Sequence, residues 1–349
     1  MGAPHRKADA QDALDYLCVD RFLRDVTQAR ALESALELGV VDWLLAHPGS
    51  TLDELATRTR MDGRGLRMLV DLLAAGDIVD ADEGGLRLAD PFLRALAYRD
   101  LMEAKLAFAR LAAADYLERF TELLAEPERF FAESGLFELF SYDRCFVSTA
   151  ENRAATARWV RITTSLTRYE SAACLDAFDM SGFQRLLDVG GNSGEFALNA
   201  CRRHPGLRAT VCDLPVVCEL GAEHVRSHAE ASRIGFHASS GVGAAMPQGH
   251  DIVSFKSMLH DWPDDAMAKF LAQAHRSLTE GGTMLLFERQ RPRYGAAPVP
   301  YSAIPLLLFF RSYRTPEDYR RALLAAGFRD VTCRTVELDM PFMLMTARR

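Results

Sequence analysis

Hydrophobic and polar positions follow different patterns in the two halves of this chain. In residues 31–45 the apolar positions recur at helical spacing, and Thr51 and Asp62 stand where helix-capping residues would open two further helices. Residues 78–88 predict two short strands around a Gly-Gly turn. Residues 101–175 predict long helices. The first half is therefore expected to be helical, with one small hairpin.

From residue 183 onward, short apolar runs alternate with helical segments. The candidate strands cover residues 185–189, 209–212, 234–237, 251–255, 283–287, 331–338 and 342–347. This alternation predicts an α/β fold with a doubly wound, mostly parallel sheet. The last two strands are joined by a short turn, which predicts one antiparallel strand at or near the edge. We expect two domains, divided at about residue 165.

Composition narrows the classes of protein that the chain can belong to. Its 349 residues, 49% of them hydrophobic, can bury a sizeable core, and the net charge of -7 argues against a dedicated nucleic-acid binder. The seven cysteines show no CxxC pair and no zinc spacing, which favours a reduced, cytoplasmic setting. We expect no signal peptide, and no apolar stretch reaches the roughly 18 residues that span a bilayer.

The predicted order of three helices followed by a hairpin is typical of a winged-helix domain. In gene regulators such a domain places its third helix in the DNA major groove. Here the third helix offers only Arg64 and Arg67 as cations. The hairpin tip carries Asp80, Asp82 and Glu83, which would repel phosphates. We therefore favour a packing or dimerisation module. A winged-helix regulator remains the alternative, and salt-sensitive DNA binding would distinguish it.

The segment LLDVGGNSGEFA, residues 186–197, links the first strand of the second half to a helix. Glycines at such a turn let a ligand approach backbone N–H groups at the helix N-terminus. However, Gly190, Gly191 and Gly194 do not fit GxGxxG, because Asn192 stands where the second motif glycine would be. A dinucleotide pyrophosphate is therefore not the favoured ligand.

Two acids lie at the ends of adjacent predicted strands. Asp188, just before the glycines, suits a ligand that carries an ammonium group. Asp213 ends the next strand, the position from which a carboxylate binds a ribose diol. Ammonium and ribose together favour S-adenosylmethionine. A dinucleotide enzyme with an altered fingerprint is the alternative.

The segment SFKSMLHDWPD, residues 254–264, follows the fourth strand, so His260 should lie at the same sheet edge as the cofactor. A single histidine is more often structural than catalytic. Here Asp261 is its neighbour, and Glu288 ends the next strand. Glu288 could accept a hydrogen bond from one imidazole nitrogen and leave the other as a base.

The sequence resembles the plant-type, caffeate-like small-molecule O-methyltransferases and their bacterial antibiotic-pathway relatives. The segments that carry the resemblance are LLDVGGNSGEFA, CDLPVV, FKSMLHDWPDD, LTEGGTMLLFE and YRTPEDYRRALLAAGF, of which HDW is the most specific. The resemblance extends over nearly the whole chain. It implies a homodimer with a winged-helix-like dimerisation and substrate-lid domain at residues 1–165. Residues 166–349 would form a Rossmann-like class I methyltransferase domain that binds S-adenosylmethionine.

The resemblance also implies roles for individual residues. The cofactor-binding residues would be Asp188, Gly190, Gly191, Asp213, Leu214 and Lys256, the last of them near the adenine. His260 would be the general base and Glu288 the carboxylate that orients it, with Asp261 beside them. A phenol has a pKa near 10, so a base must take its proton as attack on the methyl group begins.

No metal is needed for such chemistry. His224 and His228 stand four residues apart on a predicted helix and could form a ligand pair. Without a third ligand in the sequence, a solvated helix face is the favoured interpretation.

The sequence departs from the family pattern at three positions. Asn192 replaces the third glycine of the usual triple. Gly241 stands where the family has an acid that serves the adenine. Tyr313 stands where the family often has a second carboxylate beside the base.

The acceptor has to be inferred from candidate pocket walls. They are Trp159, Met258, Tyr301, Leu307 and Phe310, any of which could instead be core. If they line a pocket, we expect an O-methyltransferase that acts on a hydroxyl of a small aromatic or polyketide-like secondary metabolite. The alternative is a relative that methylates carbon or nitrogen. A further alternative uses S-adenosylmethionine for hydroxylation, decarboxylation or rearrangement.

Overall fold

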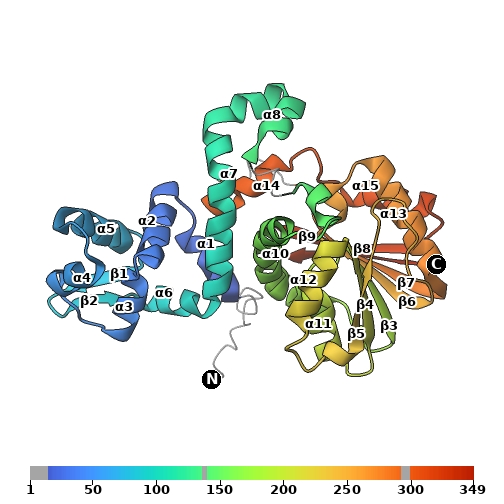
Figure 1. Cartoon of the computed structure of the whole chain (residues 1–349), viewed down its shortest axis with the longest axis horizontal. Coiled ribbons are helices and arrows are strands. Elements are labelled where there is room, and N and C mark those ends of the chain that lie inside the picture. Colours follow the sequence, from blue (N-terminus) through green and yellow to red (C-terminus); the bar gives the residue numbers. More distant parts are fainter. Residues whose placement is uncertain (1–14, 136–139, 292–298) are drawn as a thin grey trace, which may run out of the picture. The chain divides into compact units, whose positions relative to one another are not determined.

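The structure is a computed structural model, and it describes residues 15–135, 140–291 and 299–349. The chain forms two compact units (Figure 1). The first unit comprises Met1–Ala113 and Ala297–Pro305, and the second comprises Ala114–Ala296 and Leu306–Arg349. The predicted division at residue 165 differs from this one, because it falls inside α10 (Ala150–Ala177). That helix packs against α11 and α12 of the second unit.

The first unit is helical with one hairpin, as the sequence predicts. Its elements are α1 (Val19–Phe22), α2 (Val26–Glu37), α3 (Val40–Ala46), α4 (Leu52–Thr59), α5 (Gly63–Ala75), β1 (Val79–Asp82), β2 (Gly85–Leu88), α6 (Asp90–Ala95), η2 (Leu96–Tyr98), η6 (Tyr301–Ala303) and the first part of α7 (Arg99–Ala125). Both predicted caps are present. The hydroxyl of Thr51 accepts from the N–H of Glu54 in a capping box, and Asp62 accepts from the N–H groups of Arg64 and Gly65.

Residues 31–45 do not form one continuous helix. The backbone of Gly39 has φ of +74°, a left-handed conformation that ends α2 and begins α3. Glycine adopts this conformation without steric cost and commonly follows a helix C-terminus. The helical spacing of the apolar residues continues across the break, which is why it does not reveal the interruption.

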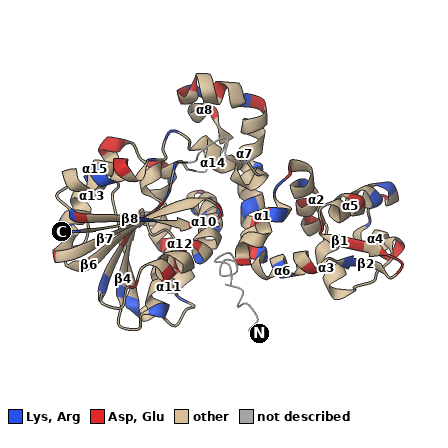
Figure 2. Cartoon of the chain, turned by 180° about the vertical axis from the view of Figure 1, so that it is seen from behind, with Lys and Arg blue, Asp and Glu red and all other residues tan. Residues whose placement is uncertain are grey.

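Helices α3 to α5 are followed by the antiparallel β1–β2 hairpin, and Ser50 forms an additional bridge with Leu86. At this hairpin Arg87 pairs with Asp82 at 2.7 Å and with Asp80 at 3.6 Å. Figure 2 shows both signs of charge on these elements. The acids of the hairpin therefore have a basic neighbour within the same hairpin.

The second unit contains the predicted sheet. Its elements are the rest of α7, α8 (Pro127–Glu133), η3 (Tyr142–Cys145), α10, β3 (Arg185–Val189), α11 (Glu195–Arg203), β4 (Arg208–Asp213), α12 (Pro215–Val225), η4 (Ala231–Arg233), β5 (Ile234–Ala238), β6 (His250–Lys256), η5 (Leu259–Asp261), α13 (Asp264–Ser277), β7 (Leu278–Arg289), α15 (Pro316–Ala325), β8 (Arg329–Glu337) and β9 (Pro341–Arg348). Helix α14 (Ile304–Leu308) contributes residues to both units. Among the helices described, none combines the length and the apolar character that crossing a bilayer requires.

The strand order is β5-β4-β3-β6-β7-β9-β8. Strands β3 to β7 pair in parallel, whereas β9 is antiparallel to both β7 and β8. The predicted doubly wound sheet with a terminal hairpin near its edge is confirmed. The chain runs outward from β3 to β5 and then returns to place β6 on the other side of β3. Ligands of such sheets bind at this reversal, outside the carboxyl ends of the strands.

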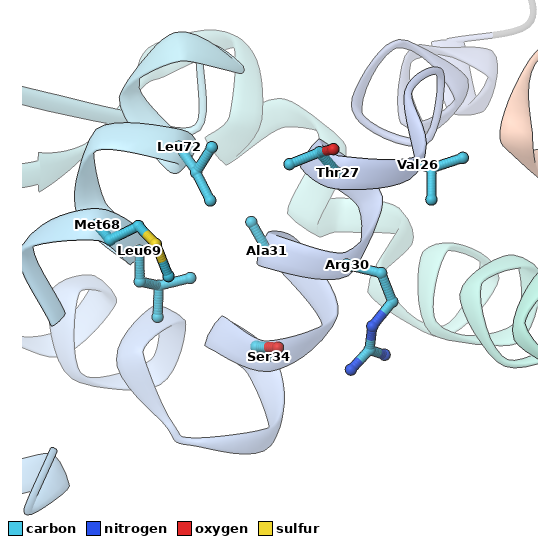
Figure 3. A pocket seen from close by; sticks show the side chains of 8 residues that line it. All are labelled: Val26, Thr27, Arg30, Ala31, Ser34, Met68, Leu69 and Leu72. Carbon is cyan, nitrogen blue, oxygen red and sulfur yellow. The ribbon is translucent and has the colours of Figure 1, made fainter. Parts of the chain in front are cut away.

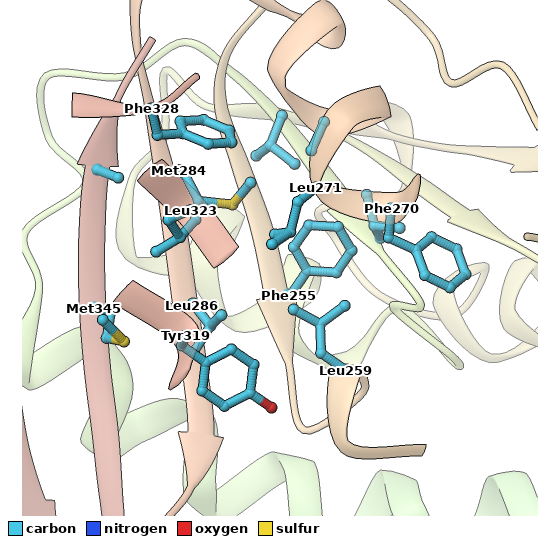
Figure 4. Packing of buried hydrophobic residues seen from close by; sticks show 14 of the residues in the cluster. Phe255, Leu259, Phe270, Leu271, Met284, Leu286, Tyr319, Leu323, Phe328 and Met345 are labelled. Atoms are coloured by element: carbon cyan, nitrogen blue, oxygen red, sulfur yellow. The ribbon is translucent and has the colours of Figure 1, made fainter. Parts of the chain in front are cut away.

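Both faces of the sheet are buried. Figure 1 shows α10, α11 and α12 on one face and α13 and α15 on the other. Successive strand residues enter different cores: Leu186 packs on the α10–α12 side and Leu187 on the α13–α15 side. Figure 4 shows the second of these cores, in which Phe255, Leu286 and Tyr319 pack together. A sheet buried on both faces is the reason why its strands appear in the sequence as continuous apolar runs.

Candidate active site

Four candidate site residues come from the carboxyl ends of adjacent parallel strands. Asp188 is the penultimate residue of β3, and Asp213 and Lys256 are the last residues of β4 and β6. Glu288 is the penultimate residue of β7. Parallel pairing brings these ends to one edge of the sheet, as the sequence predicts.

The glycine turn begins directly after β3. Gly190 has φ of +66° and Gly194 has φ of +79°, so both positions use the left-handed region. Asn192 also adopts this region, with φ of +55°, and its N–H donates to Oδ2 of Asp213 at 2.8 Å. Asparagine is one of the few residues that tolerate this conformation. The replacement of the third glycine therefore preserves the backbone of the turn.

Asp188 is buried and only partly hydrogen-bonded. Its Oδ1 accepts from the hydroxyl of Ser254 at 2.7 Å, whereas its Oδ2 has no hydrogen-bond partner among the described residues. A Cβ atom at Gly191 would lie 2.4 Å from that oxygen, so the carboxylate lies directly against the turn. Burial raises the pKa of Asp188 to about 7, against the lowering effects of Ser254 and of the charge of Lys256. A buried carboxylate of this kind fits a ligand that brings a cation.

Asp213 connects the turn to the second strand. Its Oδ1 accepts from the N–H of Leu214 at 2.7 Å, and its Oδ2 accepts from Asn192. Burial raises the pKa of Asp213 to about 6, although these two hydrogen bonds lower it. Each carboxylate oxygen retains a lone pair, so both oxygens can still accept hydroxyl groups.

The backbone at the other side of the turn approaches Met258 closely. A Cβ atom at Gly190 would lie 2.4 Å from Cγ of Met258, so only glycine fits at this position. Gly241 has φ of +103°, which disfavours any side chain there, and the ring of Phe146 lies 3.5 Å from the place its Cβ would take. The position of the missing family acid is therefore bordered by an aromatic ring.

Lys256 forms part of a buried ion-pair cluster. Its Nζ donates to Glu170 at 2.5 Å and to the hydroxyl of Thr167 at 3.3 Å, both on α10. Arg289 pairs with the other oxygen of Glu170. Burial alone would raise the pKa of Glu170, but the charges of Arg289 and Lys256 hold it at about 2. The ammonium of Lys256 is thus directed to α10.

His260 is held by Glu288 in the manner that the sequence predicts. Nδ1 of His260 donates to Oε2 of Glu288 at 2.7 Å. Oε1 of Glu288 accepts from the N–H groups of Met258 and Leu259 at 2.8 and 2.7 Å. His260 is 8% exposed and Glu288 is fully buried. One carboxylate therefore fixes both the imidazole and the backbone that carries it.

The other imidazole nitrogen faces Asp261. Nε2 of His260 lies 3.3 Å from Oδ1 of Asp261. Burial alone would lower the pKa of His260, but the negative charges of Glu288 and Asp261 raise it above its ordinary value. The pKa of Asp261 is itself raised by burial. The imidazole therefore has a carboxylate beside each of its two nitrogens.

Two aromatic rings pack against the imidazole of His260. Tyr313 is buried and packs on the imidazole with centroids 5.3 Å apart, and Phe309 meets it edge-on at 6.1 Å. Trp159 is also buried, and its indole N–H has no hydrogen-bond partner within the described chain. Phe140 links Trp159 to Phe309, with centroids 6.5 and 5.2 Å away. The site thus joins a base to apolar aromatic surfaces.

The other predicted pocket residues have different surroundings. Leu307 and Phe310 are partly buried, and the ring that meets His260 belongs to Phe309 between them. Tyr301 is buried in the first unit, where its N–H donates to the carbonyl of Arg24.

Sequence reasoning missed several residues that hold the site. The guanidinium of Arg314 donates to the carbonyls of Leu259 and Trp262, at 2.9 and 2.6 Å, and so fixes the backbone on both sides of His260. The hydroxyl of Tyr142 donates to Oδ2 of Asp261 at 2.7 Å. These partners lie 52 to 119 residues apart in the sequence, where no local pattern connects them.

His224 has a carboxylate partner. Its Nε2 lies 2.7 Å from Oε2 of Glu195, and its ring lies 5.5 Å from that of His228. Over the described residues, no cluster of three or more His, Cys, Asp or Glu side chains has an arrangement that could hold a metal ion.

A pocket in the first unit involves none of the candidate site residues. It lies between α2 and α5 (Figure 3). Its lining consists of Val26, Thr27, Arg30, Ala31, Ser34, Met68, Leu69 and Leu72.

A sequence profile of the O-methyltransferase domain matches residues 127–329, which is more than half of the chain. The chain belongs to the O-methyltransferase domain family. It is therefore an S-adenosylmethionine-dependent methyltransferase, and S-adenosylmethionine is its cofactor. The resemblance recognised in the sequence is confirmed.

Two relatives illustrate the range of the family. The 3-hydroxy-5-methyl-1-naphthoate 3-O-methyltransferase of Streptomyces sahachiroi is 34% identical over 182 residues, which is 51% of this chain and 51% of that protein. The N,N-dimethyltransferase OxyT of Streptomyces rimosus is 28% identical over 310 residues, covering 86% of this chain and 87% of that protein.

A solved structure of the same fold extends the comparison to the whole chain. Human N-acetylserotonin methyltransferase, in complex with S-adenosylmethionine, matches with a TM-score of 0.71 and 22% identity. The match covers 100% of this chain and 99% of that one. The fold predicted for the sheet domain is that of S-adenosylmethionine-dependent methyltransferases.

Proposed function

We propose that this methyltransferase acts on a hydroxyl group of a small aromatic or polyketide-like molecule, with His260 as general base and Glu288 as the carboxylate that orients it. The observation that carries the proposal is the hydrogen bond of 2.7 Å from Nδ1 of His260 to Glu288, at the same sheet edge as Asp188. The cofactor supplies a methyl group on a sulfonium. The chain has to position the acceptor and take its proton.

Glu288 determines which imidazole nitrogen is the base. Because Glu288 accepts the Nδ1 proton, the lone pair of neutral His260 lies on Nε2. An acceptor hydroxyl at Nε2 would pass its proton to that nitrogen as its oxygen attacks the methyl carbon. The new N–H would face Asp261, 3.3 Å away, which would stabilise the imidazolium. Burial of the site keeps water from competing for the proton.

The surroundings of His260 support an aromatic acceptor. Phe309, Tyr313 and Trp159 offer flat apolar surfaces, and the unpartnered indole N–H of Trp159 could donate to an oxygen of the acceptor. The Streptomyces sahachiroi relative acts on a hydroxynaphthoate, which is such a molecule. Met258, Leu307, Phe310 and Tyr301 are proposed as further pocket walls.

The cofactor residues are proposed from the turn. Asp188 would receive the ammonium through its free Oδ2, and Asp213 would receive the ribose hydroxyls beside Leu214. Gly190 and Gly191 would let the cofactor approach the backbone. Lys256 would contribute its aliphatic stem near the adenine, since its ammonium is bound to Glu170.

The assembly is proposed from the family likeness. We infer a homodimer in which the winged-helix-like first unit provides the dimer contacts and a lid over the acceptor. The cysteine pattern supports a cytoplasmic setting.

Methylation of nitrogen is the second candidate. It is supported by OxyT, a relative that is an N,N-dimethyltransferase. It is also supported by Tyr313, which replaces the second carboxylate that the family often has beside the base. An amine acceptor needs no base as strong as a phenol does, so His260 variants would retain more activity with it.

The test uses the purified 349-residue protein, S-adenosylmethionine with a labelled methyl group, and panels of hydroxyaromatic and aminoaromatic acceptors. The proposal predicts label on an oxygen of the product and loss of turnover in His260→Gln, with binding of S-adenosylhomocysteine retained. Equal turnover in His260→Gln, or label on nitrogen or carbon alone, would refute it.

A further inference from the structure

The hydrogen-bonded groups around His260 include a further residue, Tyr142, which contacts Asp261. Asp261 uses its two oxygens for different partners: Oδ1 lies 3.3 Å from Nε2 of His260, and Oδ2 accepts from the hydroxyl of Tyr142 at 2.7 Å. Glu288 binds the opposite nitrogen of His260. Four side chains therefore form a continuous polar chain, from Glu288 through His260 and Asp261 to Tyr142.

We propose that Tyr142 is a positioning residue of the methyl-transfer site, which holds the carboxylate of Asp261 against Nε2 of His260 through its hydrogen bond to the other oxygen. The proposal rests on the function proposed above and adds a residue to it.

The ring of Tyr142 is itself held by packing. It stacks on Trp262 with centroids 5.6 Å apart and an interplanar angle of 19°. Its edge meets Trp159 at 5.7 Å. Trp262 follows Asp261 in the chain, and its carbonyl is fixed by Arg314. Packing against Trp262 and Trp159 thus fixes the position of the Tyr142 hydroxyl. The hydrogen bond from this hydroxyl in turn restricts the position of the Asp261 carboxylate.

The position of Asp261 needs such support. The bond between Cα and Cβ of Asp261 can rotate, and a rotation that moves Oδ1 away from Nε2 would leave a protonated His260 with one carboxylate partner instead of two. A hydrogen bond to Oδ2 opposes this rotation. It also favours the ionised carboxylate, which is the form that stabilises imidazolium.

The titratable groups around Asp261 and His260 influence the pKa values of both residues. Asp261 is faced by His260, Tyr142, Glu288 and Arg289, and also by Tyr319 on α15. His260 is faced by Glu288, Asp261 and Arg289, and its ring by Tyr313. Tyr142 is faced by Asp261, Asp213 and Cys145.

Among these groups, Tyr142 is one that lowers the pKa of Asp261, and ionised Asp261 raises the pKa of His260. Removing the hydroxyl should therefore let Asp261 keep its proton to higher pH. The pKa of His260 should then fall.

Tyr142→Phe is a clean variant because it keeps the ring that stacks on Trp262 and removes only the hydroxyl. The matched control is Tyr116→Phe, which removes a hydroxyl from α7, where the ring of Tyr116 packs against Phe120. We would follow the imidazole signals of labelled histidine by NMR during a pH titration. The signal that disappears in His260→Gln identifies His260.

The expected result is a fall of ~0.5 unit or more in the pKa of His260 in Tyr142→Phe and no change in Tyr116→Phe. In the background of Asp261→Asn the same substitution should add no further shift, because its effect passes through the carboxylate. With an acceptor, kcat should fall roughly tenfold while the Kd for S-adenosylhomocysteine stays unchanged.

An unchanged pKa of His260 in a folded Tyr142→Phe protein would overturn the proposal, as would an equal shift with and without the Asp261 carboxylate. If Tyr142→Phe does not fold, the Asp261→Asn titration decides: an unmoved pKa of His260 there would overturn the proposal. The titration needs no acceptor. A wild-type enzyme that methylates no hydroxyl would therefore refute the proposed function separately.

Discussion

Glu288 binds His260 with one carboxylate oxygen and the N–H groups of Met258 and Leu259 with the other. The same side chain thus sets the tautomer of the imidazole and the path of the backbone that presents it. The two roles can be separated by substitution. A glutamine amide at residue 288 can still bind the backbone N–H groups, but it would favour the opposite tautomer of the imidazole.

Glu288→Gln tests this relationship. The glutamine carbonyl can still accept from the two backbone N–H groups, but its NH₂ group would face Nδ1 and favour the tautomer with the proton on Nε2. That tautomer cannot take a proton from an acceptor. We expect kcat to fall roughly 10²- to 10⁴-fold, with an unchanged Kd for S-adenosylhomocysteine in calorimetry. Glu288→Gln with near wild-type kcat would show that tautomer control by Glu288 is not needed.

Binding of the cofactor should depend on pH. Burial raises the pKa of Asp188 to about 7 and that of Asp213 to about 6. Because the ionised carboxylates bind an ammonium and hydroxyl groups best, the affinity for S-adenosylhomocysteine should increase as pH rises through this range and level off above it. Binding near neutral pH should release protons, which calorimetry in buffers of different ionisation enthalpy measures.

Asp188→Asn should weaken this binding and flatten its dependence on pH. The exposed acid Asp265 on α13 provides the control, and Asp265→Asn should behave as the wild type. An affinity of the wild type that is constant between about pH 5.5 and about pH 8 would contradict the assignment of Asp188 to the ammonium.

Phe146 borders the place where the family acid is missing, since its ring lies 3.5 Å from the Cβ position of Gly241. A base that stacks on an aromatic ring gains roughly 1–3 kcal/mol, which corresponds to a factor of about 5 to about 150 in affinity. If the ring takes over part of the adenine recognition, Phe146→Ala should raise the Kd for S-adenosylhomocysteine by such a factor. Phe146→Tyr should restore it, and an unchanged Kd in Phe146→Ala would exclude this role.

The buried cluster of Glu170, Lys256 and Arg289 should matter for stability. Glu170→Gln leaves two buried cations without their carboxylate, which typically costs about 3–5 kcal/mol. The exposed pair of Arg21 and Asp77 is the comparison, where Asp77→Asn should cost less than about 1 kcal/mol. Urea unfolding of both variants measures the difference. A similar loss of unfolding free energy in the two variants would show that the buried cluster contributes no more to stability than the exposed ion pair.

The sheet and its functional edge could be predicted from the sequence because strands buried on both faces are continuous apolar runs. Asp188, Asp213 and Glu288 lie at or next to the ends of such runs, so their meeting at one edge follows from parallel pairing alone. His260 follows β6 closely enough to share that edge. The caps at Thr51 and Asp62 were predictable for a similar reason, since each depends on residues within one turn of helix.

Contacts between distant segments could not be predicted in this way. The hydrogen bond from Tyr142 to Asp261 spans 119 residues, and the ion pair of Lys256 with Glu170 spans 86. Neither residue type nor spacing indicates such partners. The two compact units divide near residue 113 rather than at the predicted residue 165. Long helices look alike in sequence, whether they pack in the helical unit or, as α10 does, against α11 and α12 of the sheet unit.

The most direct test of the central claim is the destination of the methyl group. Wild-type enzyme and His260→Gln would be incubated with methyl-¹³C-labelled S-adenosylmethionine and a panel of hydroxyaromatic and aminoaromatic acceptors, and the ¹³C chemical shift of the product methyl would be recorded. The proposed function predicts a methyl ether from the wild type and, roughly, a 10²- to 10⁴-fold lower rate in His260→Gln. A methyl group on nitrogen or carbon alone, or the same rate in His260→Gln, would contradict it.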